Sequence, residues 1–482
     1  MAYKHGVYTN EQATSLVAPV VATAGLQVVI GTAPVNQASD PYHCTNVPML
    51  ANTLDGATAA VGYSDDYENY TLCQSMGASF KVKKVAPMVL INVLDPNKHK
   101  KNLTEKTVQI NSGVAVLEEK GVLLDKLVVK AASATLTAGT DYTAAFDDNG
   151  YVNIVVIPGG AGKSATSLTV SGVQIDPSAV TPADIVGAVS AAGVESGMEC
   201  IRMIFPKLNM VPGILIAPGW SENAIVSAGL QAKTTHINGV LNCVCIVDID
   251  SSSTGATKYD DVKQQKEKQA VTSANCYAVW LYAKVGDVLY AGSAMAAAVT
   301  VATDADNGDI PNVSPSNKTV PISAACLKDG TEVLLDQEQA NVVNSFGVAT
   351  WLNINGFRLW GNNTACYPGN TDPKDRWFSV RRFFCWDDNT FIQTYFQKVD
   401  SPANKRLIEA LVDSENVRGN SFVSRGICAR YELKYLESEN PTTNLLNGCI
   451  TFHKYMTPFG PAEDIEELVE FDPDALSTAL TQ

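Results

Sequence analysis

Short, wholly apolar runs alternate with amphipathic segments in the middle of the chain. GILIAPG (213–219) predicts a buried strand, SENAIVSAGLQAKTTH (221–236) a helix with Ser221 as its N-cap, and LNCVCIVDID (241–250) a second buried strand. YDDVKQQKEKQAVTSA (259–274) follows as a helix with a solvated polar face. Strands and helices that alternate at this spacing predict a parallel sheet covered by helices.

The same kind of pattern occurs earlier in the chain. GLQVVIGTAPV (25–35) predicts a buried strand that ends at a Gly and a Pro, and FKVKKVAPMVLINVLDP (80–96) predicts a strand pair. We therefore assign 25–105 and 191–355 to one α/β domain that is interrupted in sequence.

The interruption, 106–190, has a different pattern. Apolar and polar residues alternate there, and the turn signals Ala-Gly-Thr-Asp and Asp-Asn-Gly recur at strand-length intervals. These alternating stretches show no helical periodicity. These features predict a small β-sandwich inserted into the α/β domain.

Both ends of the chain predict arms that cannot form a core alone. Residues 1–24 are short, polar and mildly β-prone, and 461–482 carry seven acidic residues among scattered apolar ones. Between the α/β domain and the second arm, 356–460 is rich in aromatic residues and arginine, which predicts a C-terminal α+β domain. Arms of this kind suit strand exchange between subunits, and the alternative is that both fold back on their own subunit. The candidate inter-subunit residues are Val7, Tyr8, Glu11, Ile465, Leu468, Val469 and Phe471.

Composition narrows the class of protein. The 482 residues carry a formal charge of −15, which argues against a general nucleic-acid binder. No run reaches the roughly 18 apolar residues of a membrane helix, so no membrane insertion is expected. The N-terminus shows no apolar signal-peptide core, and the 11 cysteines form no Cys-x-x-Cys pair. We expect reduced thiols in a protein made in the cytoplasm.

One stretch is close to a serine-protease motif. GSAMAAAV (292–299) matches the helix-opening turn that holds the nucleophile of subtilisin-like enzymes, and Asp248 ends an upstream strand where such enzymes keep their acid. However, Ala294 stands in the nucleophile position and Ser293 comes one place too early. None of the five histidines lies in the sequence order and context that a triad requires. We therefore predict that the protein is not an enzyme.

Two further motifs lack the residues that their chemistry needs. IPGGAGKSATS (157–167) suggests a phosphate loop, but Ile157 occupies a required glycine position and the following SLTVSGVQI reads as a strand. DADNGD (304–309) suggests a calcium loop, but Gly308 falls where a ligand should be. With no His/Cys/Asp/Glu set at metal spacing, no cofactor and no metal are expected.

A series of stretches in the same order resembles the contractile-tail sheath proteins of bacteriophages. The stretches span nearly the whole chain, and the most specific are Trp360-Gly361, Val380–Arg382 and the closing Pro-Ala-Glu-x-Ile. They are GVYTNEQATS, VVIGTAPV, DPSAVTPADIVG, ILIAPG, VDID, DADNGDIPNVSPSN, NGFRLWGNNT, RWFSVRRFF and PFGPAEDIEELVEFD.

This resemblance implies a middle domain that is subtilisin-like in fold but not catalytic, with the inserted β-sandwich as a variable element. It also implies copies that stack as a helical, six-fold sheath around a tail tube and contract to drive the tube through a cell envelope. The implied partners are other copies of the chain, the tube protein, and baseplate and tail terminator proteins. The implied location is a virion tail or a contractile injection particle, assembled in the host cytoplasm.

Two other functions remain as alternatives, and one residue departs from the family. A non-enzymatic β-sandwich adhesin or surface-layer protein would need a secretion signal, and a divergent hydrolase ranks third. The family usually has an arginine after Trp-Gly-x, where this chain has Asn363, so the contact of that arginine is in doubt.

A basic cluster suggests where the tube would lie. Residues 356–460 hold 13 Lys and Arg against 11 Asp and Glu, in a chain that is otherwise acidic. Because the resemblance places this domain against the tube, the candidate tube-facing residues are Lys374, Arg376, Arg381 and Arg382. The alternative is that Arg381 and Arg382 serve packing and intramolecular ion pairs.

Overall fold

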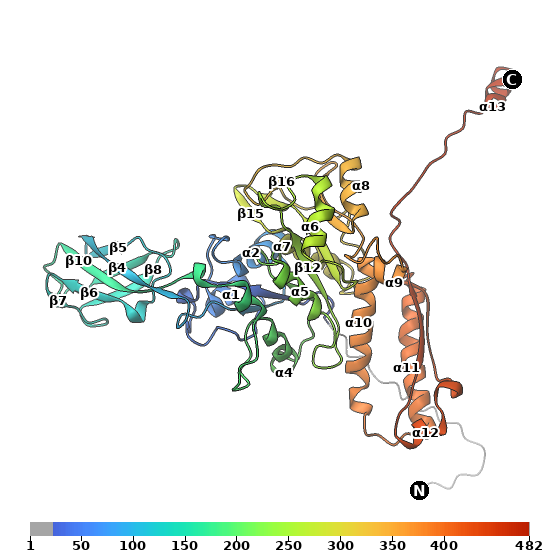
Figure 1. The fold of residues 1–482 in the computed structure, drawn as a ribbon, viewed down its shortest axis with the longest axis horizontal. Helices are drawn as coiled ribbons and strands as arrows, with labels where there is room; N and C mark the ends of the chain where they lie inside the picture. The colour runs from blue at the N-terminus through green and yellow to red at the C-terminus, as the bar shows by residue number, and fades with distance from the viewer. Residues whose placement is uncertain (1–22, 482) are drawn as a thin grey trace, which may run out of the picture.

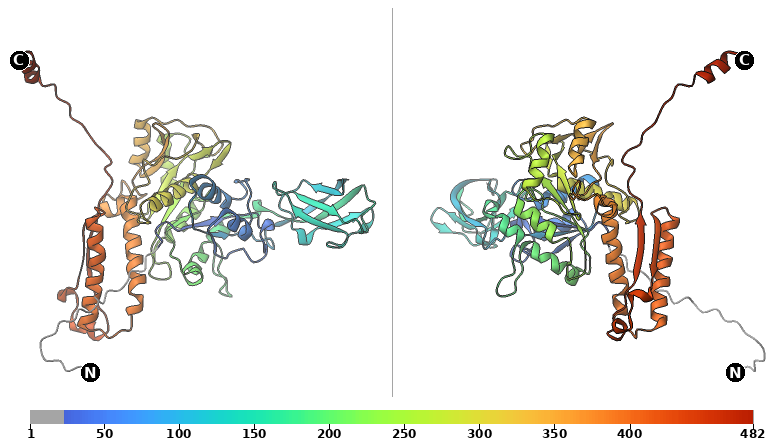
Figure 2. Two further views of the ribbon diagram at one scale, coloured as in Figure 1. Left: turned by 180° about the vertical axis from the view of Figure 1, so that it is seen from behind. Right: turned by 45° about the vertical axis from the view of Figure 1, so that its right-hand side comes forward.

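The computed structural model describes residues 23–481. A central α/β body carries two projections, a β-domain on one side and a helical C-terminal domain on the other (Figure 1). The C-terminal arm leaves the body beside α9 and points away from it, as the further views also show (Figure 2). No described helix is long and apolar enough to cross a membrane.

The α/β body is built on an eight-stranded sheet in the order β18-β17-β13-β12-β11-β1-β3-β2. The six inner strands are parallel, and β18 and β2 add antiparallel edges. All residues of β1, β3, β11, β12 and β13 are buried, which explains why they read as continuous apolar runs. The strands are β1 (Gln27–Gly31), β2 (Met49–Ala51), β3 (Met88–Asn92), β11 (Ile214–Ile216), β12 (Val244–Ile249), β13 (Cys276–Trp280), β17 (Val348–Asn353) and β18 (Phe357–Trp360).

Helices and a small second sheet complete this body. The central helix α7 packs on β12 and β13 and is buried along nearly its whole length, which its alanine-rich sequence allows. The three-stranded sheet has the order β15-β14-β16. The helices are α1 (Leu54–Val61), α2 (Leu72–Met76), α3 (Pro182–Val186), α4 (Ile204–Leu208), α5 (Ala224–Ala232), α6 (Val262–Lys268), α7 (Gly292–Asp306) and α8 (Gln337–Ser345), and the small strands are β14 (Tyr282–Val285), β15 (Val288–Tyr290) and β16 (Ala324–Cys326).

The predicted cap of the helix in 221–236 was wrong. Helix α5 begins at Ala224, and its N-cap is Asn223, whose side chain accepts a hydrogen bond from the Ile225 backbone N–H. Ser221 lies two residues earlier and is buried, and its hydroxyl donates a hydrogen bond to Asp248. A Ser and an Asn two residues apart are both good caps, so sequence alone favoured the first.

The inserted domain is an antiparallel sheet of seven strands in the order β7-β6-β10-β4-β5-β9-β8. Apolar residues of β5, β6, β9 and β10 meet in one core that is separate from the core of the α/β body. The strands are β4 (Lys100–Asn111), β5 (Val114–Leu117), β6 (Val128–Ala131), β7 (Ala134–Thr135), β8 (Tyr142–Phe146), β9 (Val152–Val156) and β10 (Ser167–Ile175).

The boundaries of this domain differ from the predicted range of 106–190. Strand β4 already begins at Lys100, which pairs with Ile175 at the end of β10. Val180 and Ile185 are part of the core of the α/β body, and α3 packs on α5. Because β4 begins with polar residues, the sequence does not show that the domain begins before residue 106.

The C-terminal domain consists of two long helices and a β-hairpin. Helix α11 packs on β19, and Gly419 provides the space, since a Cβ there would lie 2.0 Å from the Tyr431 ring. The domain was predicted from 356, but β18 completes the large sheet. Its elements are α9 (Pro373–Arg376), α10 (Phe378–Tyr395), α11 (Lys405–Ser424), β19 (Cys428–Lys434), α12 (Thr442–Leu446) and β20 (His453–Pro458), followed along the arm by α13 (Pro473–Thr481).

Candidate functional site

A buried carboxylate lies at the carboxyl end of β12, where the protease-like motif places it. Asp248 accepts hydrogen bonds from the Ser293 hydroxyl (2.6 Å), the Ser293 backbone N–H (2.6 Å) and the Ser221 hydroxyl (2.8 Å). Burial raises the pKa of Asp248, and the bonds from Ser293 and Ser221 oppose that rise. The structure thus brings together Asp248 and Ser293, which the protease-like motif had singled out separately, because β12 and the start of α7 meet at one edge of the sheet.

This cluster has the chemistry of a structural contact. Ser293, Ser221 and Ala294 are fully buried, and both hydroxyls donate to one carboxylate instead of to a histidine. A serine nucleophile needs an exposed hydroxyl and a base that takes its proton. The hydrogen-bonded side chains of Asp248, Ser293 and Ser221 therefore link β12, α7 and the segment before α5.

A second carboxylate lies close to the first. Glu222 pairs with Lys328 and accepts a hydrogen bond from the Tyr282 hydroxyl at 2.8 Å. Burial outweighs these partners and raises the pKa of Glu222 to about 7. Among the residues that the structure describes, no group of three or more His, Cys, Asp or Glu side chains could hold a metal ion.

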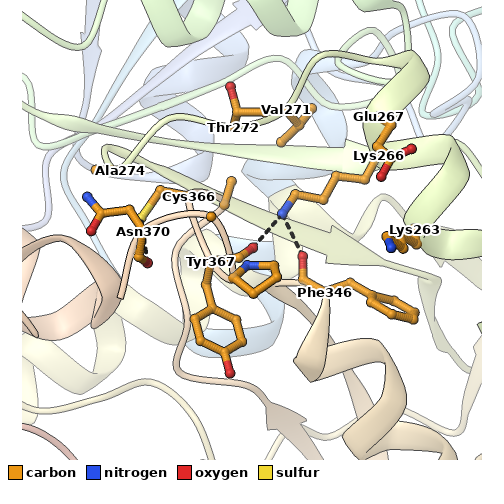
Figure 3. A pocket seen from close by; sticks show the side chains of 13 residues that line it. Lys263, Lys266, Glu267, Val271, Thr272, Ala274, Phe346, Cys366, Tyr367 and Asn370 are labelled. Atoms are coloured by element: carbon orange, nitrogen blue, oxygen red, sulfur yellow. Dashed lines mark hydrogen bonds between the residues drawn. The ribbon is translucent and has the colours of Figure 1, made fainter. Parts of the chain in front are cut away.

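A cavity of about 540 Å³ lies between α6 and the segment 365–370 (Figure 3). The Lys266 ammonium lies at its wall and donates to the backbone carbonyls of Phe346 (2.5 Å) and Tyr367 (3.0 Å). Burial lowers the pKa of Lys266 to about 8. Because both bonds go to main-chain oxygens of the following segments, Lys266 ties these segments to α6.

The four candidate tube-facing residues do not form one surface. Lys374, in α9, is exposed, with 45% of its side chain accessible, while Arg381 is largely covered and lies 3.4 Å from Asp375. Arg382 is buried and pairs with Asp304 of α7, with 2.9 Å between Nη1 and Oδ1. Arg382 is thus unavailable to a tube, and the alternative of packing and ion pairing describes both it and Arg381.

Arg376 contacts the beginning of the C-terminal arm. Its Nη2 donates to Glu463 at 2.8 Å, and its Nε donates to Asn363 at 2.8 Å. The guanidinium also lies over the rings of Trp377 (4.0 Å) and Tyr367 (4.5 Å). Asn363, which stands where the family usually has an arginine, thus accepts a hydrogen bond from an arginine elsewhere in the chain.

The C-terminal arm exposes its apolar residues. No regular secondary structure is present in 461–472, and the four candidate residues are 77–88% accessible: Ile465, Leu468, Val469 and Phe471. Burial of a side chain of this size contributes about 1.5–3 kcal/mol. Leaving these four side chains exposed to water is therefore unfavourable, and the arm is suited to packing on a partner surface. The candidate residues Val7, Tyr8 and Glu11 lie outside the described residues.

The β19–β20 hairpin has one occupied and one open edge. The Asn416 side chain bonds to both the N–H (2.7 Å) and the C=O (3.0 Å) of Leu433, so these groups point away from β20. Leu433 pairs with Lys454 and Tyr431 with Met456. By alternation, the backbone groups of Lys454 and Met456 point outward from β20. Among the described residues, none bonds to them.

Buried ion pairs hold this hairpin on the helices. Arg418 of α11 and Lys454 of β20 both pair with Asp387 of α10 and with Glu415 of α11. Although burial opposes it, Lys454 and Arg418 lower the pKa of Glu415 to about 2. Neither the cluster nor the open edge is visible in the sequence, because charges on three separate elements show no spacing signal.

Known proteins with similar sequence and fold are contractile sheaths. The chain is 27% identical to the tail sheath protein of Burkholderia phage BcepMu. The match is 493 residues long and covers 99% of this chain and 98% of the relative. Its fold is similar to the contracted PVC sheath complex of an extracellular contractile injection system (TM-score 0.58, 13% identity, 98% and 99% of the two chains). It is also similar to a chain of the six-fold symmetrised anti-feeding prophage baseplate (TM-score 0.57, 14% identity, 98% and 100% of the two chains).

These similarities agree with the resemblance seen in the sequence. No protein-family model matches the chain. The fold is a mixed α/β multidomain fold similar to that of contractile sheath structures. The predicted relation to contractile tail sheath proteins is confirmed.

Proposed function

We propose that this protein is the structural subunit of a contractile tail sheath, which polymerises around a tail tube and contracts to drive the tube through a cell envelope. The observation that carries the proposal is the full-length relation to a phage tail sheath protein, 99% of this chain against 98% of the relative. A match over both whole chains includes both arms and every domain. A match over one shared domain would not include them.

The work of such a subunit is conformational. Two packings of one lattice differ in free energy. A signal from the baseplate lets the packing of higher free energy convert to the other. We assign no catalytic role and no cofactor to the chain. The parallel sheet, with Asp248 and Ser293 at its carboxyl edge, supports a subtilisin-like frame for the middle domain, in which a buried hydrogen-bond cluster stands where a protease has its active site.

The arms link neighbouring subunits by strand addition. The C-terminal arm offers an extended segment with exposed apolar residues, and β20 offers outward N–H and C=O groups at Lys454 and Met456. Main-chain hydrogen bonds would give affinity, and alternate side chains would give specificity. Such links keep neighbours connected while the lattice repacks.

The proposed partners follow from this arrangement. They are other copies of the chain in rings of six, the tube protein, and baseplate and tail terminator proteins, on a virion tail or contractile injection particle assembled in the host cytoplasm. Of the four basic candidates, Lys374 remains suited to a tube contact because its side chain is exposed. An exposed pair of this kind contributes roughly 0.2–1 kcal/mol, so many copies would be needed.

The inserted domain lies on the outside of the proposed sheath and takes no part in the lattice. Its core is separate, and its ends are adjacent, because Lys100 pairs with Ile175. Replacing Lys100–Ile175 by a short Gly-Ser linker should therefore leave polymerisation intact, as measured by pelleting and electron microscopy. A deletion variant that folds but stays monomeric at concentrations where the full chain polymerises would place the domain in the lattice.

Electron microscopy of the purified protein tests the proposal as a whole. Subunits that carry their own linking arms should assemble into helical tubes without any other protein. Adhesin or surface-layer function predicts no such tubes.

A further inference from the structure

The beginnings of both arms contact the same segment of the chain, α9 and the start of α10. Glu463, at the start of the C-terminal arm, pairs with Arg376 at the end of α9. Ala24, where the described chain leaves the predicted N-terminal arm, accepts a hydrogen bond from Arg382 of α10 at 3.4 Å. The two arginines stand six positions apart in the sequence, so fully extended chain could separate them by only about 20 Å.

The C-terminal contact is held from several directions. The Arg376 guanidinium lies over the Tyr367 and Trp377 rings and donates a hydrogen bond to Asn363, so its direction is fixed. Gly460 passes close over Trp377, since a Cβ there would lie 3.2 Å from the indole nitrogen. The arm therefore leaves the body along a path that Arg376 and Trp377 define.

The N-terminal contact is deeper. The Arg382 side chain is 2% exposed, and its partner Asp304 is 1% exposed. A Cβ at Gly25 would lie 3.1 Å from the Asp304 carboxylate, so the chain runs directly over this ion pair. Ala24 itself is buried and its carbonyl lies close to Gly213, so this part of the chain is packed against the α/β body.

The two contacts are joined by a braced segment. Arg381 of α10 reaches back to Asp375 of α9, and its backbone N–H donates to the Trp377 carbonyl. The Arg376 carbonyl accepts a hydrogen bond from the Thr364 N–H at 2.7 Å. These contacts hold α9 and the start of α10 together, and the beginnings of both arms contact this segment.

We propose that α9 and the first turns of α10 form a shared anchor that fixes the two arms relative to each other. Arg376 and Arg382 are then positioning residues, one for each arm. In a lattice, a displacement of the neighbour that holds one arm passes through this anchor to the neighbour that holds the other. The inference rests on the proposed function of the arms and adds to it the element that couples them.

Charge exchange between Arg376 and Glu463 tests the anchor. Arg376→Glu and Glu463→Arg should each raise the critical concentration for tube formation about tenfold, a loss of ~1.4 kcal/mol per subunit added. The double variant Arg376→Glu/Glu463→Arg should recover most of this loss, because the pair is restored in the opposite sense. Lys405→Glu is the control: Lys405 is an exposed cation at the start of α11, and it pairs with Glu409 of its own helix instead of with the arm.

The outcomes separate this inference from the proposed function. If the unaltered protein forms no tubes, the proposed function fails. If it forms tubes and both single variants assemble at the same concentration, the shared anchor is wrong. Impaired single variants with no recovery in the double variant also overturn it, because the loss then has a cause other than the pair. Circular dichroism on each variant confirms that it is folded.

Discussion

We expect that ending the chain after Pro461 leaves a folded subunit that no longer polymerises. The removed segment holds Ile465, Leu468, Val469 and Phe471, which are 77–88% exposed in the single subunit. Its loss therefore costs the subunit little stability. In the lattice, however, four buried apolar side chains are worth about 1.5–3 kcal/mol each, in addition to the main-chain bonds of an added strand.

Sedimentation and electron microscopy measure this effect directly. A full-length variant with Ser at the same four positions should fail in the same way, because it keeps the chain but loses the apolar contact. A second full-length variant, Glu466→Gln with Glu467→Gln, serves as the control and should still assemble. Tubes of normal length from the truncated protein would mean that the arm has no role in linking subunits.

Replacing Arg382 by Met should destabilise the α/β body by about 3–5 kcal/mol. The substitution leaves the Asp304 carboxylate uncompensated at 1% exposure, and it also removes the bond to the Ala24 carbonyl. Adding Asp304→Leu should recover most of the loss, because an apolar pair of similar volume replaces the buried charges. Urea unfolding followed by tryptophan fluorescence measures both changes.

The matched control is Lys374→Met, which removes an exposed cation from the neighbouring helix and should change stability by no more than about 0.5 kcal/mol. Equal urea midpoints for Arg382→Met and Lys374→Met would show that the ion pair with Asp304 contributes nothing.

Much of the α/β body could be predicted because its signals are local. Strands buried on both faces read as apolar runs, so β1, β11 and β12 are visible in the sequence. The pairing of Asp248 with Ser293 at the start of α7 was not predicted, because α7 follows β15 of the small sheet and only the folded chain brings it to the end of β12. The edge strand β18 was harder to predict from the sequence, because it is antiparallel and partly exposed. Its pairing with β17 assigns it to this body.

The roles of the basic residues could not be read from sequence. Arg376, Arg381 and Arg382 are chemically alike and nearly adjacent, yet they face the C-terminal arm, Asp375 and Asp304 respectively. Their partners lie in α7, α9 and the arm, and only the folded chain brings these together. A cluster of arginines among aromatic residues is therefore ambiguous between a binding surface and an internal brace until its acidic partners are known.

Negative-stain electron microscopy of the purified full-length protein, over a range of protein and salt concentrations, shows whether this chain assembles into a sheath. The expected result is helical tubes of uniform width that form from this chain alone and disappear when the C-terminal arm is removed. A folded protein that stays monomeric at every concentration, with or without its arm, would contradict it.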